Sequence, residues 1–349
     1  MSTDMASVGP SNAACTSPAG RADHTDDVLI DVRNLKKHFP VKAEGLFGKT
    51  SYVQAVHGVS FQIQRGQTFG LVGESGCGKT TVGKMIVDLI KPTSGSIYYQ
   101  GHDLTAMPKA KRKKLCCDIQ LIFQDPYSSL NPRMRIGDII AEPIRTNRLL
   151  PREAIEDRVN ELLEYVGLAY HMRERYPHEF SGGQRQRVGI ARALAVNPKF
   201  IICDEPVSAL DVSIQAQVLN LLDDLKDQLG LTYLFIAHGL NVVKHVSDQV
   251  GVMYLGTLME VAPKSELYDN PVSPYTQALL SAVPSVDPTK KRERIILEGE
   301  TPSAIDPPEG CRFASRCFAR LDVCEKLTPS LTEISPGHFC ACHLHPGSD

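Results

Sequence analysis

The chain has 349 residues, of which 42% are hydrophobic and 22% are charged, and its formal net charge is −2. This composition is typical of a globular protein with a sizeable core, and it argues against a chain that binds nucleic acid by charge alone. No apolar run approaches the roughly 18 residues that a membrane-spanning helix needs, so we expect any link to a membrane to come through partner proteins.

The first 26 residues are polar, rich in Ser, Ala and Thr, and lack the apolar segment of a secretory signal. We therefore expect residues 1–26 to form a disordered tail and the chain to stay in the cytosol. The sequence contains ten cysteines. In a reducing compartment we expect free thiols or metal ligands rather than disulfides.

After this tail, alternating apolar residues predict strands at Val28–Val32 and Val59–Ile63, with a loop at Lys42–Tyr52 between them. The compact apolar run Gln67–Val72 predicts a buried strand. Helix-like apolar spacing follows at Met85–Ile90.

A glycine-rich segment follows the buried strand: residues 73–80 read GESGCGKT, which is the pattern GxxxxGK[ST]. Its glycines let backbone N–H groups face phosphate oxygens, and the helix that follows adds partial positive charge. Lys79 supplies a charge for the β- and γ-phosphates, and Thr80 offers a hydroxyl to Mg²⁺. The pattern predicts an ATP site formed by Gly73, Ser75, Gly76, Gly78, Lys79, Thr80 and Thr81.

The next segments combine short strands with helices. Strands are expected at Ser96–Tyr99 and Ile119–Phe123, on either side of the basic stretch Lys109–Lys114. From about Ile136 to Met172 the apolar spacing becomes helical. One helix face is formed by Ile155, Val159, Leu162, Leu163 and Val166.

Strands and helices then alternate again, with strands at Phe200–Cys203 and Thr232–Ala237 and a helix at Ile214–Leu225 between them. This alternation predicts an α/β fold with a mostly parallel sheet covered on both faces. Asp204 and Glu205 follow the first of these strands directly. Next to a phosphate loop, Asp204 is expected to hold Mg²⁺ and Glu205 to act as general base on the attacking water.

Residues 180–184 read FSGGQ, which resembles the LSGGQ signature of ABC ATPases with Phe in place of Leu. Three further motifs stand in the order typical of that family: Gln124 at the Q-loop, Asp211 at the D-loop and His238 as the switch histidine. The chain resembles ABC ATPases from about Leu29 to Gly256. The resemblance implies a P-loop NTPase fold over residues 27–265, with an antiparallel N-terminal β subdomain and a helical insertion at about 136–185.

The resemblance also implies that the ATP site is shared between two subunits. The signature residues would contact ATP bound to the opposite subunit, so two subunits would close head-to-tail around two ATP molecules. These residues are Ser181, Gly182, Gly183 and Gln184. Asp211 would communicate between the two sites, and Phe39 would stack on adenine.

The catalytic residues that the resemblance implies are Glu205, His238 and Gln124. His238 would hold the γ-phosphate and support Glu205. Gln124 would sense the attacking water and join Thr80 and Asp204 around Mg²⁺. Gly239 stands where the family usually has Asp. We still expect a catalytic site, because Glu205 and His238 are present, and the sequence does not set its rate of ATP hydrolysis.

Three longer stretches resemble a narrower group, the oligopeptide/dipeptide importer ATPases, and among them the F component: residues 124–133, 208–217 and 274–284. This resemblance implies ATP-driven import of peptides, or of nickel or glutathione, at the cytoplasmic face of the inner membrane. The implied partners are a second ATPase subunit of the D type, two membrane permease subunits and, indirectly, an extracytoplasmic peptide-binding protein. The alternative is a soluble ABC ATPase that acts in translation or DNA repair.

Residues 266–349 are predicted to form a C-terminal extension in which five cysteines lie close together in sequence. Their spacing is not a tandem CxxC zinc pattern. The resemblance implies a [4Fe–4S] cluster on Cys311, Cys317, Cys324 and Cys342, with Cys340 as an extra thiol. Zinc, or no metal, are the alternatives. The earlier thiols of Cys77, Cys116, Cys117 and Cys203 are expected to be small buried side chains.

Overall fold

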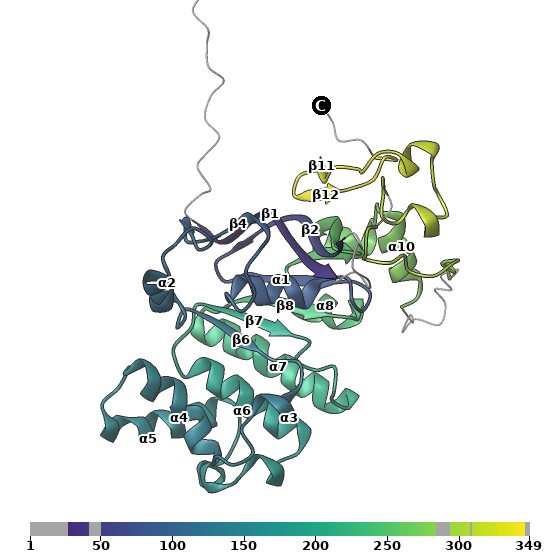
Figure 1. Cartoon of the computed structure of the whole chain (residues 1–349). Helices are drawn as coiled ribbons and strands as arrows, with labels where there is room; N and C mark the ends of the chain where they lie inside the picture. Colours follow the sequence, from purple (N-terminus) through teal and green to yellow (C-terminus); the bar gives the residue numbers. More distant parts are fainter. Residues whose placement is uncertain (1–26, 42–49, 284–293, 308, 346–349) are drawn as a thin grey trace, which may run out of the picture.

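The computed structural model describes residues 27–41, 50–283, 294–307 and 309–345 (Figure 1). The tail predicted at 1–26 and most of the loop predicted at 42–52 lie outside these residues. Among the described helices, none combines the length and the apolar character that crossing a membrane requires.

An eight-stranded sheet forms the centre of the molecule, in the order β11-β12-β10-β9-β3-β8-β7-β6. The strands from β6 to β9 in this order run parallel to their neighbours. They are β6 (Ile119–Ile122), β7 (Phe200–Asp204), β8 (Thr232–Ala237), β3 (Thr68–Val72) and β9 (Gln249–Tyr254). The predicted parallel core is therefore confirmed, with strand ends that differ from the expected ones by a residue.

The parallel strands are buried on both faces, which explains their unbroken apolar runs. Phe200 and Ile202 of β7 point into the cluster shared with the N-terminal sheet, whereas Ile201 and Cys203 point into the cluster shared with the helices. Every residue of β7 and β8 is buried. The core thus lies on either side of one sheet, and the carboxyl ends of the strands are left to carry polar groups.

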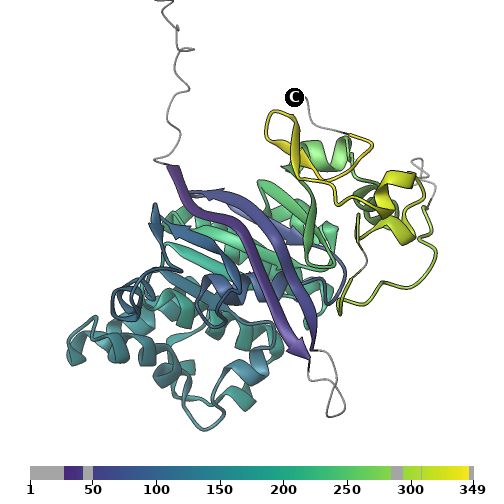
Figure 2. The same ribbon diagram turned by 45° about the horizontal axis from the view of Figure 1, so that its top comes forward.

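A second, antiparallel sheet of four strands packs over α1, in the order β2-β1-β4-β5. Its strands are β1 (Val28–Val41), β2 (Ser51–Gln64), β4 (Ser94–Tyr99) and β5 (His102–Asp103). Figure 2 shows β1 and β2 as two long strands that run side by side. The prediction that the loop reaches Tyr52 was wrong, because β2 already begins at Ser51, which pairs with Val41 of β1.

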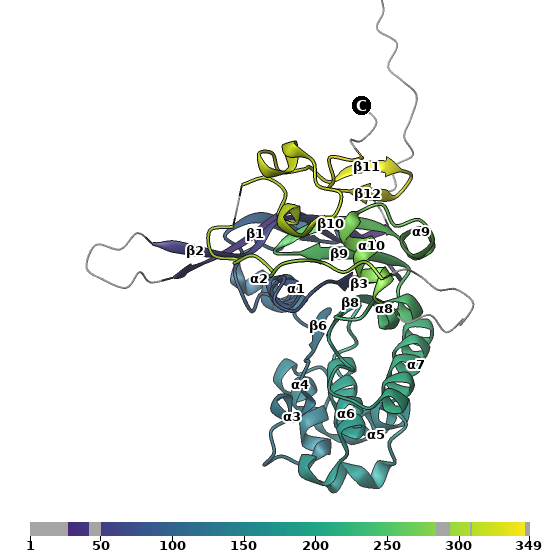
Figure 3. The ribbon, with the colours of Figure 1, turned by 90° about the vertical axis from the view of Figure 1, so that its right-hand side faces the viewer.

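Helix α1 (Lys79–Ile86) lies between the two sheets (Figure 3) and fills the space with Val82, Met85 and Ile86. The helix predicted at Met85–Ile90 was wrong, because α1 ends at Ile86. Asp88 has a left-handed backbone and Leu89 is exposed, so the apolar spacing in this segment belongs to a turn.

The predicted helical insertion lies between β6 and β7, away from the antiparallel sheet (Figures 1 and 3). It contains α3 (Pro126–Ser129), α4 (Ile136–Asn147), α5 (Ile155–Tyr165) and the start of α6 (Gly182–Leu194). All five residues of the predicted α5 face are buried. The basic stretch before β6 forms α2 (Lys109–Leu115). Short 3-10 turns occur at Arg152–Ala154, Tyr170–Glu174, Pro177–Glu179, Ala314–Arg316 and Asp322–Glu325.

The C-terminal part continues the central sheet. After α7 (Val212–Leu229) and α8 (Leu240–Val246) come β10 (Thr257–Pro263), α9 (Lys264–Asp269), α10 (Pro274–Ser281), β11 (Thr332–Ser335) and β12 (His338–Cys340). Strand β12 pairs with β10. The fully buried Glu260 of β10 accepts a hydrogen bond of 2.7 Å from Nε2 of His338 and two more from the backbone before α10. The boundary at 265/266 stays a prediction, and the sheet runs across it.

Candidate active site

The phosphate loop joins β3 to α1, and two of its glycines are required by the space around them. Gly73 and Gly78 have φ values of 149° and 106°. A Cβ at Gly73 would lie 2.0 Å from the carbonyl oxygen of Met253, and one at Gly78 would lie 2.1 Å from that of Ala55. The loop therefore passes against β9 and β2 with no room for side chains at these positions.

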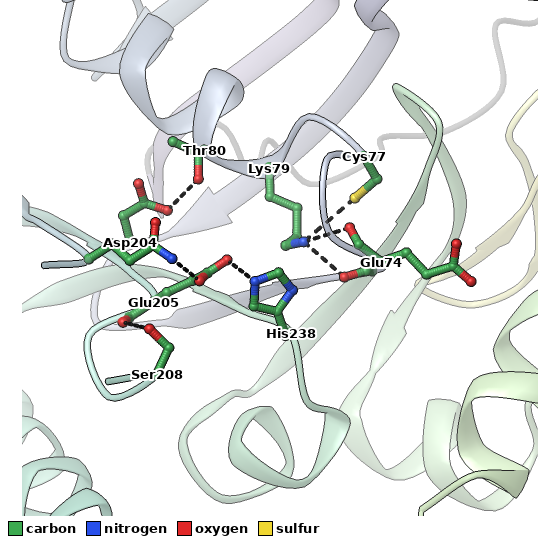
Figure 4. A network of polar contacts seen from close by, with 10 residues as sticks. Glu74, Cys77, Lys79, Thr80, Asp204, Glu205, Ser208 and His238 are labelled. Carbon is green, nitrogen blue, oxygen red and sulfur yellow. Dashed lines mark hydrogen bonds and ion pairs between the residues drawn. The ribbon is translucent and has the colours of Figure 1, made fainter. Parts of the chain in front are cut away.

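Within this loop, Lys79 is 3% exposed. Its Nζ donates to the carbonyl oxygens of Gly73 (2.8 Å) and Glu74 (3.0 Å) (Figure 4). Ser75 and Gly76 are exposed at the tip of the loop, and Thr81 is partly buried in the first turn of α1. The ammonium group thus lies inside a loop whose tip is open to solvent, as a site for an anion requires.

Thr80 and Asp204 bring two oxygen groups together at the edge of the sheet. Thr80 Oγ1 donates to Asp204 Oδ1 at 2.7 Å. Burial raises the pKa of the Asp204 carboxyl, while this hydrogen bond and the charges of Lys84 and Lys79 oppose the rise. A hydroxyl and a carboxylate at this distance fit the hard oxygen ligands that Mg²⁺ prefers.

Glu205 is held from two sides. It is 5% exposed and accepts hydrogen bonds from Gln124 Nε2 and from His238 Nε2, each at 2.6 Å. Its φ of 48° lies in the left-handed region, which directs the chain away from β7 directly after Asp204. The structure therefore brings together the three residues predicted to be catalytic, from the ends of three neighbouring segments of the sheet. Figure 4 shows the contact of Glu205 with His238.

The signature residues lie in a different part of the molecule, at the start of α6. Ser181 caps this helix: the Gln184 N–H donates to Ser181 Oγ at 3.3 Å, and the Ser181 N–H donates to Gln184 Oε1 at 3.0 Å. A Cβ at Gly183 would lie 2.4 Å from Ile214 Cγ2, so glycine allows α6 and α7 to pack closely, and Gly182 is partly buried beside Leu210. Among the described residues no hydrogen bond joins Ser181 to the phosphate loop. Ser181 precedes α6, which lies with the helices of the insertion, whereas the phosphate loop precedes α1, which lies between the two sheets (Figure 3), so the signature and the loop lie apart within one chain.

Three further predicted residues lie at the surface. Phe39 on β1 is 36% exposed, and Nζ of Lys37 lies 4.9 Å from its ring centroid. Asp211 is the N-cap residue of α7 and its side chain makes no cap hydrogen bond. A Cβ at Gly239 would meet nothing within 4 Å, so the position has room for the Asp that the family usually has.

Sequence reasoning missed the contacts of Glu74, the second residue of the loop. Its carboxylate binds Arg316, and its N–H donates to the hydroxyl of Tyr275. Tyr275 lies in the segment 274–284 that already suggested a peptide importer. No local pattern indicates a contact between residues 242 positions apart.

Comparisons with known proteins cover both parts of the chain. A family profile described as ABC transporter matches residues 56–208, and one described as the C-terminal region of oligopeptide/dipeptide transporters matches residues 259–324. The oligopeptide transport ATP-binding protein AppF of Bacillus subtilis is 53% identical over 323 residues, which cover 91% of this chain and 98% of AppF. The chain belongs to the ATP-binding proteins of the oligopeptide/dipeptide ABC transporter family.

A second relative of this ABC ATPase is the dipeptide transport ATP-binding protein DppF of Escherichia coli, 49% identical over 90% of this chain and 93% of DppF. Among solved structures, the dimeric post-hydrolysis state of the ATP-binding cassette MJ0796, bound to ADP and Pi, matches with a TM-score of 0.60 and 27% identity. It covers 68% of this chain and 99% of MJ0796. The predicted ABC ATPase fold and the ATPase class are therefore confirmed.

The cysteines of this ABC ATPase differ in part from the expectation. Cys77 and Cys203 are buried as predicted, but Cys116 is exposed and Cys117 is half-buried. That prediction was wrong because Cys116 caps the C-terminus of the basic helix α2 at the surface. Among the described residues there is no group of three or more His, Cys, Asp or Glu side chains placed to hold a metal ion. The structure therefore gives no support to the predicted iron–sulfur cluster.

Proposed function

We propose that this chain is the ATP-hydrolysing subunit that powers import of di- or oligopeptides across the cytoplasmic membrane. The observation that carries the proposal is the similarity to peptide-transport ATP-binding proteins over nine-tenths of the chain, including a C-terminal region specific to that group. A soluble ABC ATPase of translation or DNA repair is not favoured, because such a protein gives no reason for this C-terminal match.

The phosphate loop binds the β- and γ-phosphates through its backbone N–H groups and Lys79. When Mg²⁺ is bound, Thr80 and Asp204 would hold it, and the ion would neutralise charge on the phosphate oxygens. The exposed face of Phe39 offers a surface on which adenine stacks. These residues fix the nucleotide on one side only.

Hydrolysis needs a water that attacks the γ-phosphorus while the bond to the ADP oxygen breaks. Glu205 takes the proton of this water as general base. Gln124 and His238 each hold one oxygen of its carboxylate, so they fix the orientation of the base before the water arrives. The side chain of His238 is 43% exposed at the sheet edge, and in this proposal it also contacts the γ-phosphate.

The other side of the nucleotide comes from a second ATPase subunit, which we propose to be a D-type chain. Support comes from the separation of Ser181 and the phosphate loop within one chain, and from the dimeric form of the similar MJ0796 cassette. Closure of the pair on ATP would shift the helical insertion against two membrane permease subunits. The extracytoplasmic peptide-binding protein acts through these subunits, and the chain lies peripherally on the cytoplasmic face.

The test is purification of the chain from membranes with its bound subunits, followed by reconstitution in vesicles. We expect two membrane subunits to co-purify and ATP to drive uptake of a labelled dipeptide or oligopeptide in the presence of the peptide-binding protein. A complex that hydrolyses ATP but takes up no peptide would contradict the substrate. A chain that brings no membrane subunit would contradict the transport role.

The [4Fe–4S] cluster on Cys311, Cys317, Cys324 and Cys342 stays a prediction. Burial, with a smaller contribution from the charges of Cys324, Cys342 and Cys317, raises the pKa of the Cys311 thiol to about 11 against an opposing backbone hydrogen bond from Phe313. A set of four thiols is the donor set typical of such a cluster. No step of ATP hydrolysis depends on it.

Anaerobic purification checks this prediction. We expect about four iron atoms and four labile sulfides per chain, with broad visible absorption. Cys342→Ser should lose the iron, whereas Cys340→Ser, the matched control two residues away, should keep it. Iron-free protein with stoichiometric zinc would favour the zinc alternative, and protein with neither metal would contradict both.

A further inference from the structure

The C-terminal extension reaches the phosphate loop through one arginine. Arg316 belongs to the short 3-10 helix Ala314–Arg316, and its Nη1 donates to both carboxylate oxygens of Glu74, at 2.9 and 3.0 Å. The side chain of Arg316 is only 11% exposed and that of Glu74 is 28% exposed. A largely buried ion pair therefore joins two segments that are 242 positions apart in sequence.

Two more groups of the same extension hold Glu74. The Thr301 hydroxyl donates to Glu74 Oε2 at 3.1 Å, and the Glu74 N–H donates to the Tyr275 hydroxyl at 3.2 Å. Tyr275 is fully buried and packs against Tyr254 and Phe313, with ring centroids 4.7 and 5.1 Å apart. The side chain and the N–H of Glu74 are thus fixed by a rigid aromatic and polar support.

Glu74 carries a negative charge at a loop that binds a polyphosphate. Its carbonyl oxygen accepts from Lys79 Nζ, so this residue is directly beside the cation of the loop. Figure 4 shows that the Glu74 carboxylate nevertheless points away from Lys79 and Thr80. A free carboxylate here would compete with phosphate for the N–H groups and the lysine, and it would repel the nucleotide.

We propose that Arg316 is a positioning residue for ATP binding: it neutralises the Glu74 carboxylate and holds it away from the phosphate side of the loop. The inference rests on the proposed function in one respect, namely that residues 73–80 bind ATP. It gives the C-terminal extension a role in the nucleotide site that does not depend on any bound metal.

Four variants of the full chain test this proposal by the equilibrium affinity for Mg²⁺ and a fluorescent ATP analogue. Arg316→Met is expected to weaken binding about tenfold, the effect of losing one buried charged contact. Glu74→Gln alone is expected to change affinity by less than about twofold, since it removes the competing charge that Arg316 otherwise neutralises. The double variant should bind like Glu74→Gln, so removing the carboxylate rescues the loss of the arginine.

Arg320→Met is the matched control, because Arg320 forms an exposed ion pair with Glu325 inside the same extension. It should leave affinity unchanged. A purely structural role for Arg316 would lower the melting temperature without rescue by Glu74→Gln. Unchanged affinity in Arg316→Met, or a double variant as weak as Arg316→Met, would overturn the proposal. If residues 73–80 do not bind ATP, Lys79→Ala will bind the analogue as well as the wild type does. This outcome separates a failure of the proposed ATP site from a failure of the proposal for Arg316.

Discussion

Glu205→Gln is expected to lower steady-state ATP hydrolysis by about 10²- to 10⁴-fold, the range typical of losing a general base. The affinity for ATP should change by less than about twofold, because the residue acts on the water and not on the nucleotide. The substitution keeps the shape of a side chain that is 5% exposed, and the left-handed backbone at this position treats Gln and Glu alike. An ATP-bound closed assembly should therefore accumulate.

Phosphate release and size-exclusion chromatography with ATP measure these two effects. Glu164→Gln is the matched control, since it removes the same charge from an exposed position on α5, and it should leave both readouts unchanged. Unchanged turnover in Glu205→Gln would remove Glu205 from the role of base. Lost nucleotide affinity would mean that this carboxylate organises the binding site instead.

The features predicted correctly from sequence are those that local patterns encode. The parallel strands are buried on both faces, so their apolar runs stand out, and the phosphate loop follows one of them in a fixed pattern of glycines. At Gly73 and Gly78 the structure shows why, since a Cβ would collide with backbone carbonyl oxygens. The segment order then places Asp204 and Glu205 at the same sheet edge as the loop.

The features that sequence could not predict depend on contacts between distant segments. Strand β1 extends beyond its alternating part because it stays paired with β2 as far as Val41. Several register shifts in this pairing break the apolar period, so alternation alone does not predict the rest of the strand. Strand β12 adds to the central sheet through β10, supported by Glu260 and His338, which are 78 positions apart. The ion pair of Glu74 and Arg316 belongs to the same class. Such contacts produce no periodic pattern in the sequence from which they could be predicted.

Lys79→Ala and Ser181→Arg are expected to abolish hydrolysis by different routes. Lys79 lies inside the phosphate loop, so its loss should weaken ATP binding to the isolated chain by about 100-fold or more, as expected for a buried charge that binds phosphate. Ser181 is exposed at the start of α6, away from this loop, so Ser181→Arg should leave ATP binding to the isolated chain within about twofold of the wild type. It should instead prevent ATP-dependent closure with the partner ATPase.

Equilibrium binding of the ATP analogue to the isolated chain, and ATP-dependent assembly in the Glu205→Gln background, separate the two effects. Loss of the Ser181 cap costs about 1 kcal/mol of stability, which a folded domain tolerates. Ser330→Arg provides the matched control, because it places the same side chain at an exposed serine of the C-terminal extension. If Ser181→Arg weakened binding to the isolated chain as much as Lys79→Ala does, both residues would serve one pocket within one chain. If the nucleotide is held between two subunits, the opposite result is required. The Ser181→Arg chain alone must then bind the ATP analogue as well as the wild type does, and it must fail to close with the partner ATPase.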